Sequence, residues 1–133
     1  GGRYSDEWHV QHMTDPQSVV PQSIMPKYGF LRDTDLATSE MADKLRALRR
    51  VGVPYTDRDI GEAMADAILQ ADPEQDAGDF AKRYPKAQIR DYDGQADRVT
   101  EMDALVAYLQ VLGTMVDVNS AAAQEKLATE KGR

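Results

Sequence analysis

The segment from Thr100 to Gly113 limits the possible folds more than any other part of the chain. Its first four residues, Thr100 to Asp103, approximate a capping box, in which a hydroxyl and an acidic side chain satisfy free N–H groups at a helix start. An apolar stripe at helical spacing follows and stops before a glycine: Met102, Leu105, Val106, Leu109 and Leu112. We therefore expect a core helix here, which needs a second surface to pack against: a neighbouring helix, such as the one that begins after Thr56, or a second molecule.

Three earlier segments also carry helix signals. Ser5 can cap a helix over residues 6–13, and Ser39 can cap a second helix that ends near Gly52. Thr56 can cap a third helix. The second helix has Met41, Leu45 and Leu48 on one stripe, and the third has Ile60, Ala63, Met64, Ala67, Ile68 and Ala71 at the spacing of a buried face.

The remaining segments are less regular. Residues 74–84 can form one short helix that ends before Pro85, because a residue preceding proline avoids helical dihedrals. Residues 89–99 form a polar connector with a turn at Asp93-Gly94. Since no segment has a strand pattern, the sequence predicts an all-α fold with four to five helices over residues 1–118. We expect residues 119–133 to form a frayed or disordered tail.

Charge and composition exclude several functions. The 133 residues fit one domain. Their net charge of −7 argues against nucleic-acid binding, which depends on lysine and arginine at phosphates, and favours a basic protein partner. No apolar run approaches the ~20 residues that cross a bilayer, so we expect a soluble chain that does not span the membrane. Cysteine is absent, and neither histidine lies in a hydrolytic motif.

A proline-rich stretch lies between the first two predicted helices. Pro16, Pro21 and Pro26 recur five residues apart, which indicates a stiff, largely extended loop with one possible turn from Pro16 to Val20. Met25 stands beside the last of these prolines. A thioether held in such a loop can serve as a soft axial ligand to haem iron, whereas a gap-filling methionine is the ordinary alternative. Spacing alone favours that ordinary alternative.

Four stretches resemble one known family. They are residues 2–9, GRYSDEWH; residues 19–26, VVPQSIMP; residues 45–56, LRALRRVGVPYT; and residues 100–114, TEMDALVAYLQVLGT. Together they resemble the mono-haem cytochrome c subunit of cbb-type cytochrome c oxidases, the FixO or CcoO family. The likeness spans roughly residues 2–118, in the family's order.

The resemblance implies a class I cytochrome c-like domain, truncated because the family's membrane anchor and Cys-x-x-Cys-His segment lie upstream of these residues. It implies haem c in the full-length parent, with Met25 as the sixth, metal-binding ligand and Ile24 and Pro26 beside it. Without cysteine, these residues cannot attach haem covalently. Catalysis by these residues alone is not expected.

Tyr4 and Trp8 lie one turn apart and can line a porphyrin edge, although Trp8 is equally suited to a core anchor. Arg3 can pair with a haem propionate, although a surface position is its simpler assignment. His9 and His12 lack further ligands for a metal site, and the family's proximal histidine belongs to the missing motif. We do not assign either histidine to iron.

The implied function is electron transfer within a membrane-bound haem-copper oxidase. The expected partners are the other oxidase subunits and a basic cytochrome donor, at the periplasmic face of the bacterial inner membrane. The alternative is an acidic, all-helical interaction module without a cofactor. Its working face would be residues 57–79, where eight carboxylates accompany only Arg58. A solvated helix face is the simpler interpretation of that stretch.

Overall fold

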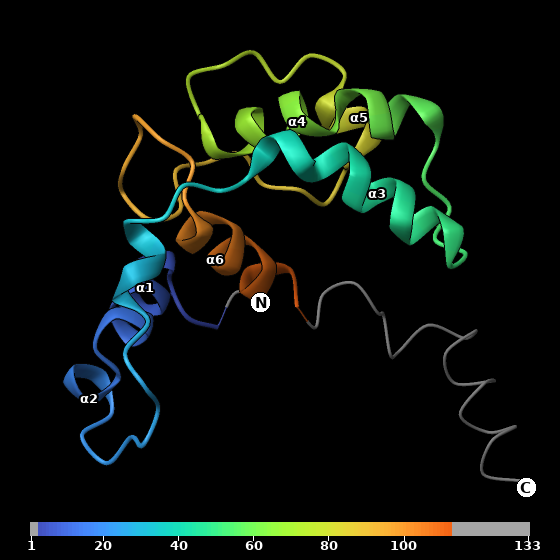
Figure 1. Cartoon of the computed structure of the whole chain (residues 1–133). Helices are drawn as coiled ribbons and strands as arrows, with labels where there is room; N and C mark the ends of the chain where they lie inside the picture. Colours follow the sequence, from blue (N-terminus) through green and yellow to red (C-terminus); the bar gives the residue numbers. More distant parts are fainter. Residues whose placement is uncertain (1–2, 113–133) are drawn as a thin grey trace, which may run out of the picture.

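The computed structural model describes residues 3–112, and its regular elements are helices (Figure 1). Two short helices, α1 (Asp6–Thr14) and α2 (Pro16–Val19), are followed by 3-10 turns η1 (Gly29–Arg32) and η2 (Thr38–Glu40). Then come α3 (Met41–Arg50), α4 (Asp57–Ala71), α5 (Phe80–Arg83) and α6 (Glu101–Val111). The described residues contain no sheet, only one isolated antiparallel bridge between Asp35 and Thr100. The all-α prediction is confirmed.

The core forms where α6 crosses α1 and η1. Met102 and Val106 of α6 are fully buried, and Tyr92 from the preceding connector packs with them. Three partly buried side chains from α1 and η1 complete this cluster: Val10, Met13 and Leu31. We expected α6 to pack on α4 or on a second molecule. Instead, α6 packs on α1 and η1, whose apolar side chains cover its buried residues.

Helix α3 and helix α4 form an antiparallel pair. Thr56 begins α4 with a complete capping box, in which its side chain accepts from the Asp59 N–H. The Ser39 cap was wrong: residues 38–40 wind into η2, so α3 begins after Glu40, whose backbone is already helical at φ −88° and ψ −5°. Two members of the expected buried stripes are exposed, since Leu48 is 42% and Met64 48% exposed.

The predicted helix over residues 74–84 shrinks to the single turn of α5. The carboxylates of Asp72 and Asp76 accept hydrogen bonds from backbone N–H groups two residues later, at 3.0 Å each. Such local bonds compete with helix formation. Gly78 also takes φ +45°, a left-handed conformation that interrupts the helix.

The connector before α6 is anchored by the buried capping box that the sequence predicted. Thr100 accepts from the Asp103 N–H, and the Asp103 carboxylate accepts from the Thr100 N–H at 2.9 Å. The same carboxylate also accepts from the N–H groups of Tyr92 and Asp93. Gly94 has φ +82°, which confirms the predicted turn.

None of the helices in residues 3–112 is long and apolar enough to span a bilayer. The expected stop at Gly113 and the expected tail at 119–133 lie outside the described residues.

Candidate functional site

A stack of aromatic side chains runs along α1 from the residue before its cap. Ser5 caps the helix by accepting from the Trp8 N–H at 3.1 Å. The rings of Tyr4 and Trp8 stack at 4.0 Å between centroids, and His12 stacks on the other side of Trp8 at 4.7 Å. The Arg3 guanidinium lies 5.5 Å from the Tyr4 ring centroid. The structure therefore brings Arg3, Tyr4 and Trp8 together.

His12 is the member of this stack that sequence reasoning missed. The signal was present, because Trp8 and His12 are four residues apart and side chains at that spacing meet on one helix face. His9 makes an edge contact with Trp8 at 5.3 Å. Burial lowers the pKa of His9, which favours the neutral ring.

Met25 lies in the loop between α2 and η1, and its two neighbours project outward. Met25 is half-buried, whereas Pro26 is exposed and Ile24 is 99% exposed. The Met25 N–H donates to the Ser23 hydroxyl at 3.2 Å. Ile24 therefore lies open to solvent and forms no wall of a closed pocket in this conformation.

The C-terminal end of this loop is fastened to the end of α1. The Tyr28 N–H donates to the Met13 carbonyl at 2.7 Å, and Lys27 lies 3.1 Å from the Asp15 carboxylate. Pro16, at the start of α2, is less than 2% exposed. Because α1 also carries the aromatic stack, one short helix positions both groups of predicted site residues, while the bonds that fix Met25 itself are local to its loop.

An apolar groove of about 1140 Å³ lies between α4, the segment after α5, and α6. Leu36, Met41, Tyr84 and Tyr108 are among its lining residues. The face of α6 that does not contact α1 lines this groove. Sequence reasoning did not locate it, because it depends on how α4 and α6 are spaced.

Asp91, Asp93 and Asp103 are the group of carboxylates in the described residues that is close enough to hold a metal ion, with oxygens within 4.8 Å of one another. The buried pair already accepts hydrogen bonds from protein donors: the Thr100 hydroxyl donates to Asp93 at 2.7 Å, and backbone N–H groups donate to Asp103. Burial, and then the neighbouring Asp93 charge, raises the pKa of Asp103. These contacts explain the cluster as the anchor of α6.

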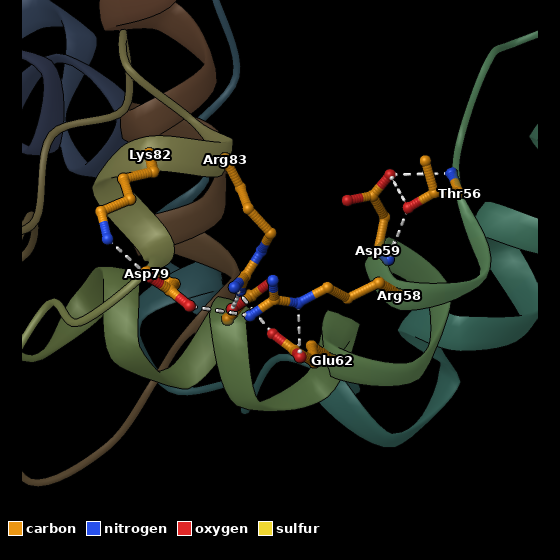
Figure 2. Close-up of polar contacts among 8 residues, drawn as sticks. Thr56, Arg58, Asp59, Glu62, Asp79, Lys82 and Arg83 are labelled. Atoms are coloured by element: carbon orange, nitrogen blue, oxygen red, sulfur yellow. Dashed lines mark hydrogen bonds and ion pairs between the residues drawn. The ribbon is translucent and has the colours of Figure 1, made fainter.

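The acidic stretch at residues 57–79 is not uniformly negative in three dimensions. Arg58 binds Glu62 at 2.9 Å and Asp79 at 3.2 Å, and Arg83 of α5 binds Glu62 at 2.7 Å and pairs with Asp66 (Figure 2). Lys82 also pairs with Asp79 at 3.0 Å, and hydrogen bonds from Lys82 and Arg58 lower the pKa of that carboxyl. Cations from α4 and α5 thus pair with three of the eight carboxylates that an acidic docking face would use.

Comparison with known families decides the assignment. A family model described as "Cytochrome C oxidase, mono-heme subunit/FixO" matches residues 1–116. The chain belongs to the FixO family. No match was found among curated proteins.

FixO membership makes this chain part of a cytochrome c oxidase mono-haem subunit, a family that binds haem and transfers electrons. The residues present fit one part of a haem site: a thioether on a fastened loop and a flat aromatic stack. The 133 residues contain no cysteine, so they do not supply the thiols for covalent attachment.

Proposed function

We propose that Met25 is the sixth ligand of the haem in this FixO-family subunit, which accepts electrons and passes them toward the catalytic haem-copper subunit. The observation that supports this proposal most strongly is the placement of Met25, which is half-buried in a loop whose C-terminal end is fastened to the end of α1. A loop that is tied down next to the ligand holds a side chain at a fixed height without requiring it to be part of a helix. This is the requirement for an axial ligand.

The residues around Met25 restrict its backbone. Pro26 has no N–H and fixes its own φ, which limits the conformations of the preceding methionine. The Ser23 hydroxyl accepts the Met25 N–H, so that polar group needs no other partner. A thioether is a soft ligand that favours ferrous over ferric iron and raises the reduction potential. Haem, when bound, carries the electron.

Tyr4, Trp8 and Arg3 form the second part of the proposal. The stacked rings offer a flat apolar surface with a phenol OH and an indole N–H at its rim, and the Arg3 guanidinium adds a positive charge beside them. These groups suit a porphyrin edge and its propionates. Ile24 and Pro26 are proposed to lie against the porphyrin beside Met25, which would cover the exposed Ile24 side chain.

We place the complete subunit at the periplasmic face of the bacterial inner membrane, with the other oxidase subunits and a basic cytochrome donor as partners. Covalent haem c attachment is assigned to the complete subunit, because no thiol occurs within these residues. The FixO match supports this placement through the oxidase complex to which the family belongs.

A haem titration of the 133-residue chain tests the ligand. Ferric haem is added with one equivalent of imidazole as the second axial ligand, and visible spectra are recorded for the wild type, Met25→Ala and Met64→Ala. Met64 is an exposed methionine on α4 and serves as the matched control. We expect low-spin bands in the wild type and Met64→Ala, and their loss in Met25→Ala. Identical spectra in all three proteins would contradict the assignment.

A further inference from the structure

The C-terminal end of α3 presents cations beside exposed apolar side chains. We call this surface the α3 tip and define it by Arg46, Leu48, Arg49, Arg50 and Val51. Leu48 is 42% exposed and Val51 is 79% exposed. Figure 1 shows the end of α3 and the following turn at the edge of the molecule, away from α1 and α2. The tip is therefore accessible to a large partner.

The charge of the tip differs in sign from that of the chain. The net charge of the chain is −7, yet the stretch from Lys44 to Val51 contains four basic residues and no acidic one. Arg46 and Arg49 contact exposed carboxylates at 2.6 and 2.7 Å, and such surface pairs hold their partners weakly. Among the ion pairs of residues 3–112, none involves Arg50.

A purely structural role explains the arginines of the tip but not its exposed apolar side chains. Cations in the last turn of a helix interact favourably with its dipole, which explains why arginines gather there. The dipole gives no reason for Leu48 and Val51 to stay exposed. The turn makes the exposure of Val51 persistent, because Gly52 at φ +100° ends the helix directly behind it.

We propose that the α3 tip binds the headgroup layer of a membrane that contains anionic phospholipids. Guanidinium groups pair with lipid phosphates, while a protruding valine and leucine enter the shallow apolar boundary below them. A specific protein interface uses roughly 20–30 residues on each side, whereas the tip offers five. A fluid lipid layer suits this small surface better than an acidic protein does.

The negative charge elsewhere in the chain does not prevent this contact. At physiological ionic strength the Debye length is about 8 Å, so the membrane acts mainly on the charges closest to it. Binding should accordingly weaken as salt is raised. The proposal uses FixO membership only to place the chain in an oxidase complex, and it is independent of Met25 and haem.

Vesicle co-sedimentation of the haem-free, 133-residue chain tests the proposal. The vesicles contain phosphatidylglycerol in phosphatidylcholine, with pure phosphatidylcholine for comparison. We expect Arg46→Gln/Arg50→Gln to lower the partition coefficient for the anionic vesicles about 30-fold, since each cation near such a surface contributes about fivefold. Val51→Gln should lower it several-fold.

Two control variants make the same kinds of substitution at surface positions outside the α3 tip. Lys82→Gln/Lys86→Gln removes two exposed cations near α5, and Met64→Gln replaces an exposed apolar residue on α4. Both should bind like the wild type, and far-ultraviolet circular dichroism confirms that every variant is folded. The proposal is overturned if the wild type binds both vesicle types equally, or if the control and tip variants lose the same fraction of their binding to anionic vesicles. It is also overturned if polyglutamate captures the chain and anionic vesicles do not.

Discussion

At the scale of single residues, the same four-residue capping motif occurs twice in different surroundings. Thr56 and Asp59 form a capping box at the surface, whereas Thr100 and Asp103 form one in the interior, where Thr100 is 0% and Asp103 3% exposed. Hydrogen bonds exposed to water are readily replaced, and buried ones are not. The two boxes should therefore differ in what they contribute to stability.

Replacement of the cap threonines measures this difference. Thr100→Ala removes the hydroxyl that donates to Asp93 at 2.7 Å and accepts the Asp103 N–H at 3.1 Å. We expect it to lower the free energy of unfolding by about 2–3 kcal/mol, against about 1 kcal/mol for Thr56→Ala. Urea unfolding of both variants gives the comparison. Equal losses would show that burial of the second box has no energetic consequence.

The raised pKa of Asp103 gives a pH dependence with a definite sign. The folded state binds the proton more tightly than the unfolded chain does, so the contribution of Asp103 to stability is full below its ordinary pKa of 3.8 and is lost as pH rises through the raised value. Asp93→Asn removes the nearby charge and should lower the pKa of Asp103 in an NMR titration. Asp97→Asn, at an exposed position, should leave it in place. A pKa that does not respond to Asp93→Asn would rule out the proposed electrostatic cause.

At the scale of elements, the helices that sequence predicted best are those with a side-chain cap. Ser5, Thr56 and Thr100 all cap as expected, because the interaction lies within four residues of sequence. The second helix starts one residue later than Ser39 implies, and local carboxylate bonds reduce the 74–84 helix to α5. In both places two local structures compete, and sequence alone gives no way to rank them.

Helix α5 is one turn long and is held to α4 by Arg83, which contacts Glu62 at 2.7 Å and pairs with Asp66 (Figure 2). The side chains of Arg83 and Asp66 are only 13% and 11% exposed. Arg83→Gln should lower the thermal midpoint by several degrees, because it leaves the Asp66 carboxylate without its cation. Lys82→Gln, which removes an exposed pair, should change it little. Equal midpoints in a thermal unfolding scan would show that the contact does not hold α5.

At the scale of the whole molecule, the contacts that join distant segments could not be predicted from the sequence. Asp6 accepts from Arg90 at 2.5 and 2.9 Å and from Gln110 at 2.7 Å, across 84 and 104 residues. Sequence predicts Asp6 only as a helix-start residue. For the site, the Tyr4–Trp8 stack was foreseeable from helical spacing, whereas the packing of α6 on α1 and the groove beside α4 depend on the full fold.

A comparison of Asp6 with Glu7 isolates the contribution of these long-range contacts to the free energy of unfolding. Both lie in the first turn of α1, so each alanine variant loses a similar interaction with the helix dipole. Asp6→Ala also loses three charge-assisted hydrogen bonds. We expect it to cost about 2–3 kcal/mol more than Glu7→Ala in denaturant unfolding. Matching losses would mean that these contacts do not stabilise the assembled domain.

The central claim is that Met25 ligates the haem iron, and the most direct test is the reduction potential of the complete, haem-loaded subunit with and without this methionine. A thioether favours ferrous iron, so Met25→Ala should lower the potential and remove the low-spin methionine-ligated spectrum. Met64→Ala should retain both. If Met25→Ala keeps the wild-type potential and spectrum, another residue ligates the iron, and the assignment of the α2–η1 loop as the ligand loop is wrong.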